Sequence, residues 1–415
     1  MGKIGFITVR YGLDVTGGAE FHCRMLAERI AGQYDVEVLT TTVKDYTTFI
    51  PEVKEGTYEL NGVKIRRFDN NPFNRTYYEQ LQKKSKKASK IRRLIYRLNL
   101  SNIIFPIFPI WNYQKDVEYK LMKNYGFYSD NLLNYLKEHK DEYDALIFIT
   151  YENALTQLGD FIAPEKTILI PTAHLESMLF RSINSHLFTK VGFIAFNTDT
   201  ERKMCQKIFQ HKLAPNDVVS VGVDITSASK EEIEKVKDHF PKQYLLFCGR
   251  IVEGKLNNFL DYFLAFKNKY NTDLKLVLTG DLFMPKVEHP DIIYTGFVTE
   301  SEKTALIMNS FAVVNPSIYE SLSLIALEAL SLGKMVIANK KCNVMIEHEA
   351  KSNGALICYK SKNNLHKILL ELIENPSLME EKGRAGIKYV SENYQWDVII
   401  DKLLAVIEKF KLKRL

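Results

Sequence analysis

Short apolar runs alternate with amphipathic segments along the whole chain. In the first half, the apolar runs are residues 4–9, 36–40, 146–150, 167–170, 193–196 and 218–221. In the second half, they are residues 244–248, 275–278, 292–294, 311–314 and 335–338. Between the runs, apolar residues recur at helical spacing, as at Ala19, Cys23, Leu26 and Ile30. Short apolar runs are typical of buried parallel strands, so the pattern predicts an α/β fold with doubly wound sheets.

The two series of runs predict two Rossmann-like domains, since 415 residues are too many for one ordinary core. We expect the first domain at residues 1–222, with a basic and apolar insertion at about 80–115. The second domain is expected at 223–395, and a terminal helix at 396–415. The polar stretch 222–240 is the expected linker. Ligands are expected in a cleft between the domains, where parallel strands end.

Composition narrows the class of protein. A hydrophobic content of 46% excludes disorder, and a net charge of +6 says little about partners. The five cysteines are scattered without a CxxC pair, which argues against a disulfide framework or a zinc site and for a reducing compartment. Met1-Gly2-Lys3 leads directly into the first apolar run, and no run reaches 18 apolar residues. We therefore expect a cytoplasmic protein without a signal peptide or a membrane span.

The segment from Asn315 to Leu330 has the most specific pattern. The chain turns at Pro316-Ser317 after an apolar strand and then enters a helical pattern. The expected helix start comprises Ser321, Leu322, Ser323 and Leu324, and one helix face is expected to carry Leu322, Ile325, Ala326 and Ala329. Free backbone N–H groups and the positive end of the helix dipole make such a start a seat for phosphate.

Two glutamates, Glu320 and Glu328, flank this helix start. If the residues between them are helical, the rise of 1.5 Å per residue separates the glutamates by roughly 12 Å, which is about the span of a sugar diphosphate. The alternative interpretation is an amphipathic helix with two solvated glutamates.

Two cations follow the first strand of the second domain. Gly249-Arg250 and Gly254-Lys255 place a guanidinium and an ammonium five residues apart across a turn that contains glycine. Both can converge at the carboxyl edge of the sheet, and a nucleoside diphosphate needs partners of this kind.

A glycine pair, Gly17-Gly18, lies between the first strand and the first helix. Glycines there allow backbone amides to approach a phosphate, although turn glycines are common. The dinucleotide GxGxxG spacing is absent, and the second strand ends in Thr40-Thr41-Thr42 where an NAD-binding chain carries an acidic residue. These features argue against an oxidoreductase.

Glu320 and Glu328 together resemble the Glu-x7-Glu signature of retaining GT-B nucleotide-sugar glycosyltransferases of the family 4 type, a group that includes bacterial polysaccharide and glycolipid glycosyltransferases. The chain departs from it at Ser321 and Ser323, where many members have glycine. The resemblance covers nearly the whole chain in order and is sharpest from Phe247 to Cys342. It implies that Glu320 holds hydroxyls of the donor sugar and Glu328 the ribose.

The same resemblance implies further roles. Gly249, Arg250 and Lys255 look like the family's diphosphate clamp, and Gly17-Gly18 like the loop that contacts the diphosphate or the acceptor. By its position after a strand, His174 matches a histidine placed against the transferred sugar, although a solitary histidine there is more often structural. Gly296, Phe297 and Val298 match a loop that touches the nucleobase. The terminal helix is expected to cross back onto the first domain.

These motifs predict a retaining glycosyltransferase that moves a sugar from a nucleoside-diphosphate sugar to a hydroxyl of a glycan acceptor. The chain has no convincing Asp-x-Asp metal motif, Walker A loop or HExxH motif, so we expect no cofactor and no metal requirement. The resemblance implies that the leaving phosphate takes the acceptor proton. Three alternatives remain at this point: an epimerase, a phosphorylase, or a nucleotide-binding protein without turnover. The nucleobase, the sugar, the acceptor and the oligomeric state are left open.

Residues 83–97 form a strongly basic segment with an apolar stripe. Ile91, Leu94, Ile95 and Leu98 have helical spacing, and an apolar run with two prolines and Trp111 follows at residues 103–111. This combination suits an amphipathic helix on an anionic membrane surface. We therefore expect peripheral association with the inner face of the cell membrane and a lipid-linked glycan acceptor. A solvated charge run is the alternative, and nothing else in the sequence supports nucleic-acid binding.

Overall fold

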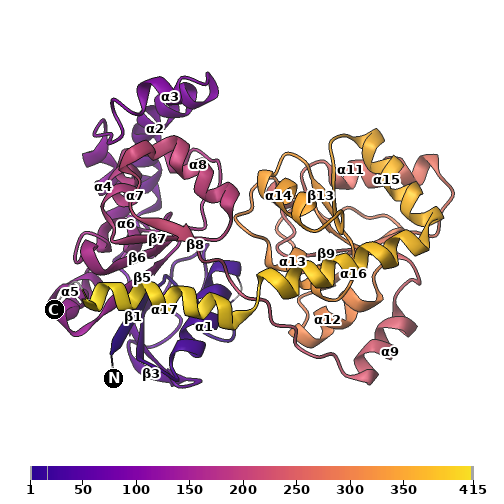
Figure 1. The fold of residues 1–415 in the computed structure, drawn as a ribbon, viewed down its shortest axis with the longest axis horizontal. Helices are drawn as coiled ribbons and strands as arrows, with labels where there is room; N and C mark the ends of the chain where they lie inside the picture. The colour runs from indigo at the N-terminus through magenta and orange to yellow at the C-terminus, as the bar shows by residue number, and fades with distance from the viewer. Residues whose placement is uncertain (1, 16, 413–415) are drawn as a thin grey trace. The chain divides into compact units, whose positions relative to one another are not determined.

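The chain folds into two α/β units, each built around a mainly parallel sheet (Figure 1). The computed structural model describes residues 2–15 and 17–412. Unit 1 comprises Met1–Val221 and Asp397–Leu415, and unit 2 comprises Gly222–Trp396. The predicted fold class, α/β with two Rossmann-like sheets, is confirmed.

Unit 1 contains an eight-stranded sheet in the order β3-β4-β2-β1-β5-β6-β7-β8. Its strands are β1 (Lys3–Ile7), β2 (Asp35–Thr41), β3 (Gly56–Leu60), β4 (Val63–Phe68), β5 (Ala145–Ile149), β6 (Thr167–Ile170), β7 (Phe193–Phe196) and β8 (Asn216–Val218). Its helices are α1 (Gly18–Ile30), α2 (Arg75–Arg97), α3 (Ser101–Ile104), α4 (Lys115–Lys123), α5 (Asp130–His139), α6 (Ala154–Gly159), α7 (Ser182–Lys190), α8 (Asp199–Phe209) and α17 (Trp396–Leu412).

One part of the unit 1 sheet departs from the parallel pattern. Strands β3 and β4 pair antiparallel, with a two-residue turn at Asn61-Gly62 whose φ angles are 51° and 77°. Asn-Gly is the strongest short hairpin signal, because both turn residues need positive φ. The apolar pattern does not reveal this hairpin because most of β3 is exposed.

Unit 2 contains six parallel strands in the order β11-β10-β9-β12-β13-β14. The strands are β9 (Tyr244–Cys248), β10 (Lys275–Thr279), β11 (Ile292–Gly296), β12 (Ala312–Asn315), β13 (Val336–Asn339) and β14 (Leu356–Tyr359). The helices are α9 (Lys230–His239), α10 (Glu253–Leu256), α11 (Phe259–Lys269), α12 (Glu300–Asn309), α13 (Leu324–Ser331), α14 (Asn343–Lys351), α15 (Lys362–Glu374) and α16 (Pro376–Asn393).

The expected linker at residues 222–240 is wrong in its second half. Residues 230–239 form α9, which begins with a capping box between Ser229 and Glu232. Ser301 of α12 donates a hydrogen bond to Glu232, so α9 belongs to unit 2. The charged composition of α9 reflects an exposed helix in which only Val236 is buried, and not a flexible connection.

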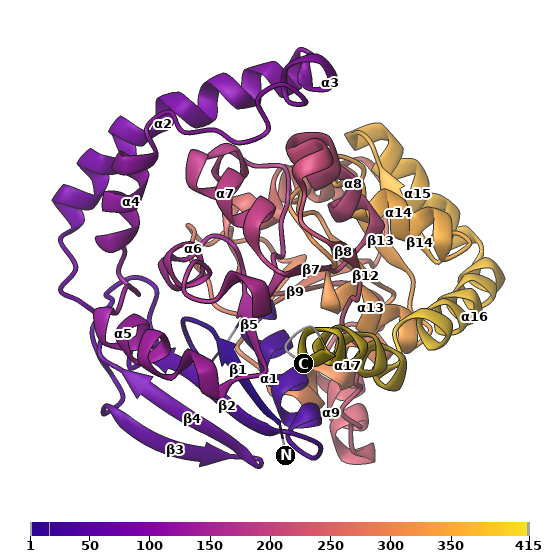
Figure 2. The same ribbon diagram turned by 60° about the vertical axis from the view of Figure 1, so that its left-hand side comes forward.

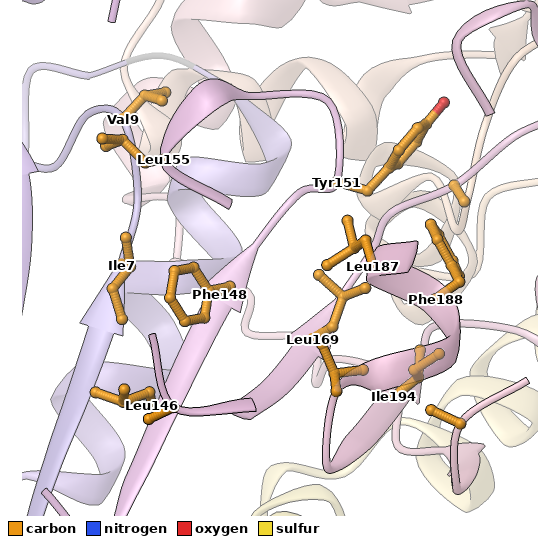
Figure 3. Close-up of a cluster of buried hydrophobic side chains, with 14 of the residues drawn as sticks. Ile7, Val9, Leu146, Phe148, Tyr151, Leu155, Leu169, Leu187, Phe188 and Ile194 are labelled. Carbon is orange, nitrogen blue, oxygen red and sulfur yellow. The ribbon is translucent and has the colours of Figure 1, made fainter. Parts of the chain in front are cut away.

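Each sheet is held by its own apolar core. In unit 1, Ile7, Leu146, Phe148, Leu169 and Ile194 extend from neighbouring strands into one cluster (Figure 3). In unit 2, the buried face of α11 contributes Phe259, Phe263 and Phe266. The cores leave the loops that follow the strands to carry polar side chains.

Helix α17 packs on unit 1, where Figure 1 shows it beside β1 and β5. Tyr34 donates a 2.5 Å hydrogen bond to Glu408, and Lys411 lies 3.9 Å from Asp144. A Cβ added at Gly192 would lie 2.9 Å from the Phe410 ring, so glycine allows the helix to approach closely. Among the described residues, no helix is both long enough and apolar enough to span a bilayer.

Glu37, fully buried on β2, ties four parts of unit 1 together. Its carboxylate is 2.9 Å from both Lys3 and Arg66, and it accepts a 2.7 Å hydrogen bond from Tyr143. Burial alone would raise its pKa, but the bonds from Tyr143, Lys3 and Arg66 lower the pKa to about 2.

We predict that Glu37→Gln lowers the free energy of unfolding at pH 7 by about 2 kcal/mol. Because the folded pKa lies below the ordinary 4.5, this stabilisation is complete above about pH 4.5. It fades as the pH falls towards 2. Urea unfolding followed by hydrogen exchange in unit 1 measures it, with the exposed Glu59→Gln as control. A difference between Glu37→Gln and wild type that is independent of pH would contradict the prediction.

Candidate active site

The predicted donor residues of unit 2 follow the carboxyl ends of its parallel strands. Arg250 follows β9 and Glu320 follows β12, and these two strands are neighbours. The chain runs from β9 to β10 and β11 on one side and then crosses to β12 on the other side. Such a switch in strand order is where open α/β sheets bind ligands, so Arg250 and Glu320 flank the expected binding position.

An ion pair joins the two loops at this position. Lys255, in α10, donates a 2.6 Å hydrogen bond to Glu320. Asn257 donates a further hydrogen bond of 3.0 Å to the Pro316 carbonyl. Sequence reasoning gave Lys255 and Glu320 separate roles and did not predict their contact. Arg250 is exposed, and within the described part of the chain its guanidinium has no ion-pair partner.

The segment between the two glutamates is only partly helical, which corrects the predicted spacing. Helix α13 begins at Leu324, because Ser323 adopts a left-handed conformation with φ of 71°. Leu322 lies outside the helix, and the residues buried on α13 include Leu327 and Leu330 as well as Ala326 and Ala329. A helical rise therefore does not apply between Glu320 and Leu324.

The loop before α13 is held by polar contacts. Asn315 donates a 2.6 Å hydrogen bond to the Ser323 hydroxyl, and His348 is 2.8 Å from the Leu322 carbonyl. The Ser323 side chain makes no capping bond to the helix. The first turn of α13 is therefore left for another acceptor, as the predicted phosphate seat requires. Ser321, next to Glu320, is half-buried.

Glu328 is buried in α13 and pairs with Lys303 of α12 at 2.8 Å. Burial raises the pKa of Glu328, and the nearby ammonium opposes that rise. Burial alone would lower the pKa of Lys303, but Glu328 and Glu300 raise it. Lys303 therefore stays charged. Sequence reasoning missed this lysine because no motif near it in α12 indicates a partner in α13.

Three glycines shape the same edge of the unit 2 sheet. Gly249, Gly280 and Gly296 follow β9 and β10 and end β11, with φ angles of 142°, 123° and 72°. The Gly280 N–H donates to the Gly296 carbonyl, so the strand ends remain paired at the edge. Phe297 is 67% exposed, and Val298 is half-buried.

In unit 1, Gly17-Gly18 opens α1 as predicted. A Cβ at Gly17 would lie 2.2 Å from a Glu20 carboxylate oxygen. Glu20 pairs with Arg10 at 2.8 Å, and both side chains are buried. Position 17 therefore requires glycine because a larger residue would clash with the Glu20 side chain, whether or not a ligand binds there.

His174 lies after β6, four residues beyond the strand end. Its Nε2 atom is 3.2 Å from Glu176, which also accepts a 2.8 Å hydrogen bond from Tyr151. Glu152, which follows β5, completes a group whose potential ligand atoms lie within 4.8 Å of one another. Sequence reasoning singled out His174 but missed Glu152 and Glu176; the His-x-Glu spacing was the available signal.

The comparisons with solved structures agree with this architecture over the full chain. Sucrose-phosphate synthase from Thermosynechococcus elongatus superposes with a TM-score of 0.68, 14% identity and 100% of both chains covered. HepE of Anabaena, in complex with UDP and glucose, has a TM-score of 0.68 and 15% identity, covering 99% of this chain and 100% of that chain. WaaG, a glycosyltransferase involved in lipopolysaccharide biosynthesis, has a TM-score of 0.62 and 13% identity, covering 97% of this chain and 99% of that chain.

The chain has the GT-B glycosyltransferase fold. The family described as Glycosyl transferases group 1 matches residues 242–375, which lie in unit 2. That segment contains the Gly249–Lys255 turn and both glutamates of the predicted signature.

Two curated relatives match more locally. An uncharacterized glycosyltransferase of Methanocaldococcus jannaschii is 25% identical over 176 residues, 40% of this chain and 44% of the relative. An uncharacterized protein in the cps region of Klebsiella pneumoniae is 23% identical over 190 residues, 45% of this chain and 50% of the relative. The chain thus spans about half the length of the curated relatives that it matches.

We predict that Gly280→Ala destabilises this GT-B fold by about 1–3 kcal/mol. The new Cβ would lie 2.2 Å from the Gly249 carbonyl oxygen, at a φ of 123°. Gly254→Ala is the matched control, since a Cβ there meets nothing within 4 Å. Urea unfolding followed by hydrogen exchange in unit 2 compares them. Equal stability of the two variants would show that the β9 and β10 ends do not depend on this approach.

Proposed function

We propose that this protein is a retaining glycosyltransferase that moves a sugar from a nucleoside-diphosphate sugar to a hydroxyl of a glycan acceptor. The observation that carries the proposal is the Lys255–Glu320 ion pair at the switch point of the unit 2 sheet, where Arg250 also follows β9. Support comes from the group 1 match over residues 242–375 and from the solved GT-B structures that contain UDP.

The geometry suits a departing diphosphate. An ammonium has three N–H donors, so Lys255 can hold Glu320 with one donor and phosphate with the others. Arg250 is exposed at the same edge and offers a guanidinium fork that matches phosphate oxygens. The uncapped start of α13 adds backbone donors and the positive end of a helix dipole. These groups stabilise developing negative charge without a metal ion, and we propose metal-independent transfer in which the leaving phosphate takes the acceptor proton.

The remaining donor contacts follow from the same edge of the sheet. Glu320, oriented by Lys255, binds hydroxyls of the donor sugar. Glu328 binds the ribose, with Lys303 holding its carboxylate in place. Gly296, Phe297 and Val298 face the nucleobase; the exposed Phe297 ring offers a surface on which a base can stack.

On the acceptor side we assign Gly17-Gly18 and His174. The Arg10–Glu20 pair already fills the first turn of α1 with a carboxylate, which favours a neutral sugar over a diphosphate at that loop. An epimerase, a phosphorylase or a binding protein without turnover is less well supported, because the similar solved structures include two synthases and a glycosyltransferase.

A panel of UDP-, GDP- and ADP-sugars tests the donor site. Wild type should hydrolyse or transfer one donor class slowly, and its activity should survive EDTA. Arg250→Ala should reduce the activity by roughly ten- to a hundredfold, since a charge-assisted hydrogen bond contributes about 1.5–3 kcal/mol. Arg384→Ala, an exposed arginine elsewhere in unit 2, is the control.

Undiminished turnover in Arg250→Ala would remove the clamp. Loss of activity in EDTA, restored by Mg²⁺ or Mn²⁺, would contradict metal-independent transfer. Absence of turnover with every donor, together with tight nucleotide binding, would favour the binding protein.

We further propose that helix α2 docks the enzyme on an anionic membrane that carries a lipid-linked acceptor. The structure supports this through the polarity of the helix: its buried face carries Leu81, Ser85, Ala88, Ser89 and Arg92. Helix α2 packs on α4 and on the turn Met178–Phe180. Ser177 lies just before that turn, and its hydroxyl is 3.3 Å from that of Ser89. The apolar stripe is left outside.

The outward stripe continues into the next segment. Leu94 and Leu98 are 56% and 59% exposed, and Ile103, Ile107 and Phe108 are 64%, 66% and 57% exposed. In Figure 2, α2 and α3 lie together at the margin of unit 1. Lys83, Lys84, Lys86, Lys87 and Lys90 are exposed along the same helix. Cations beside an exposed apolar stripe match an anionic headgroup layer above acyl chains.

We predict that the protein co-sediments with vesicles that contain anionic lipid and that salt weakens the binding. Changing Lys83, Lys84, Lys86 and Lys87 to Glu should abolish it, because each cation contributes about 1 kcal/mol near such a surface. The matched control changes four exposed lysines elsewhere in unit 1, Lys54, Lys123, Lys137 and Lys212, to Glu. Equal loss in both variants, or equal recovery in the supernatant with and without anionic vesicles, would leave a soluble acceptor.

A further inference from the structure

Two threonines with strained backbones begin the loops that carry Glu152 and His174 in unit 1. Thr150 follows β5 and Thr172 follows β6, and their φ angles are 64° and 52°. Positive φ is a genuine outlier for a β-branched residue, and such strain gathers where function requires it. The residues that follow these threonines include Tyr151, Glu152 and His174.

Hydrogen bonds keep both threonines in this conformation. The Thr150 and Tyr151 N–H groups donate to the Ile170 and Pro171 carbonyls at 2.9 and 3.1 Å. Asn153 donates to the Thr150 hydroxyl at 2.7 Å. On the other strand end, the N–H of Ala173 donates to the buried Glu201 carboxylate. The backbone therefore presents the side chains of Glu152 and His174 to one another.

The resulting group is centred on Glu176. One of its oxygens accepts a hydrogen bond from Tyr151 at 2.8 Å and lies 3.2 Å from His174 Nε2. A carboxylate oxygen of Glu152 lies within 4.8 Å of an oxygen of Glu176 and of a ring nitrogen of His174. Two carboxyl groups this close cannot both be charged at little cost, which favours a proton on one of them.

Several groups influence that proton. Burial, followed by the hydrogen bond and charge of Glu176, raises the pKa of Glu152 to about 9, while Tyr151 and Arg181 oppose the rise. Tyr125 also lies within electrostatic range of Glu152. Because the raised pKa lies above neutral pH, Glu152 carries the proton at pH 7 and loses it as the pH rises through about 9.

We propose that Glu176 and Glu152 are positioning residues for His174: Glu176 accepts the Nε2–H of the imidazole, and Glu152 donates the shared proton to Glu176. This arrangement fixes the tautomer of His174 with its proton on Nε2 and its lone pair on Nδ1. An imidazole held in this way presents a fixed pattern of donor and acceptor to a sugar hydroxyl. The assignment of the hydroxyl rests on the proposed function, but the tautomer does not.

The imidazole nitrogens report the tautomer directly. In the 15N-labelled full chain, a long-range 1H–15N correlation spectrum should show His174, assigned through His174→Gln, as the Nε2–H form at pH 7. Glu176→Ala should convert it to a mixture with the Nδ1–H form. Glu176→Gln should restore much of the Nε2–H form, because its amide oxygen also accepts; this variant also covers the case in which Glu176→Ala fails to fold.

Glu152→Gln separates the shared proton from the carboxylate. Its amide N–H donates to Glu176 at every pH, and Glu176 still accepts from the imidazole, so the Nε2–H form of His174 should persist in this variant. Glu176→Ala should lower kcat at least tenfold with little change in the donor KM. Glu142→Gln is the control, since Glu142 lies 4.0 Å from His139 in the same unit. It should change neither readout.

Three results would overturn the proposal. The first is an Nδ1–H tautomer in wild type, and the second is an unchanged tautomer in Glu176→Ala. The third is a rise in melting temperature with Mn²⁺ or Zn²⁺ that Glu152→Gln abolishes, because the same three side chains would then bind a cation instead of a proton. If no donor is ever turned over but the spectra behave as expected, the positioning stands and the glycosyltransferase assignment falls.

Discussion

The ion pair between Lys255 and Glu320 is the interaction on which the carboxyl edge of the unit 2 sheet depends. It joins the loops after β9 and β12, the two neighbouring strands between which the strand order reverses. Neither loop contains a helix long enough to support itself there, since α10 has only four residues and α13 begins only at Leu324. The pair is half-exposed, so its worth for stability is small. Its value lies in orientation, because the carboxylate and the ammonium then face the same position at the carboxyl edge.

The helices and strands of this fold could be predicted where their burial produces a clear pattern of apolar residues. Strands β6, β7 and β9 have the predicted bounds because parallel strands covered on both faces are continuously apolar. Strand β3 could not be found in this way, because most of its residues are exposed. The Asn61-Gly62 pair was the available signal for the turn that follows it. Helix α9 was taken for a linker because only Val236 is buried among its charged residues.

The candidate site divides along the same line. Residues joined by a local motif, such as Gly249 with Arg250, or Glu320 with Glu328, stand out in the sequence. Contacts between distant segments do not. Lys255 pairs with Glu320, 65 positions away, and Lys303 with Glu328, 25 positions away, and no local motif indicates either pairing. Ser323 shows a third limit. Its backbone is left-handed and its hydroxyl is bonded to Asn315, so α13 begins only at Leu324. A serine in a sequence does not predict such a conformation.

A buried arginine explains why α2 presents its apolar side to solvent. Arg92 is fully buried, and its guanidinium lies 5.0 Å from the Phe105 ring and 5.9 Å from that of Trp111. Among the described residues, none of its three nitrogens has a hydrogen-bond partner. Burial lowers its pKa to about 10, so it remains charged at neutral pH.

The aromatic rings compensate that charge in part, since a cation over a desolvated ring is attracted by about 2 kcal/mol. Turning α2 to bury Leu94 and Leu98 would remove Arg92 from these rings and carry exposed lysines towards the interior, where each would lose its hydration. The seat of Arg92 thus fixes the rotation of the helix. The outward apolar stripe is a consequence of that rotation. It leaves the side chains of Leu94 and Leu98 exposed on the surface of unit 1.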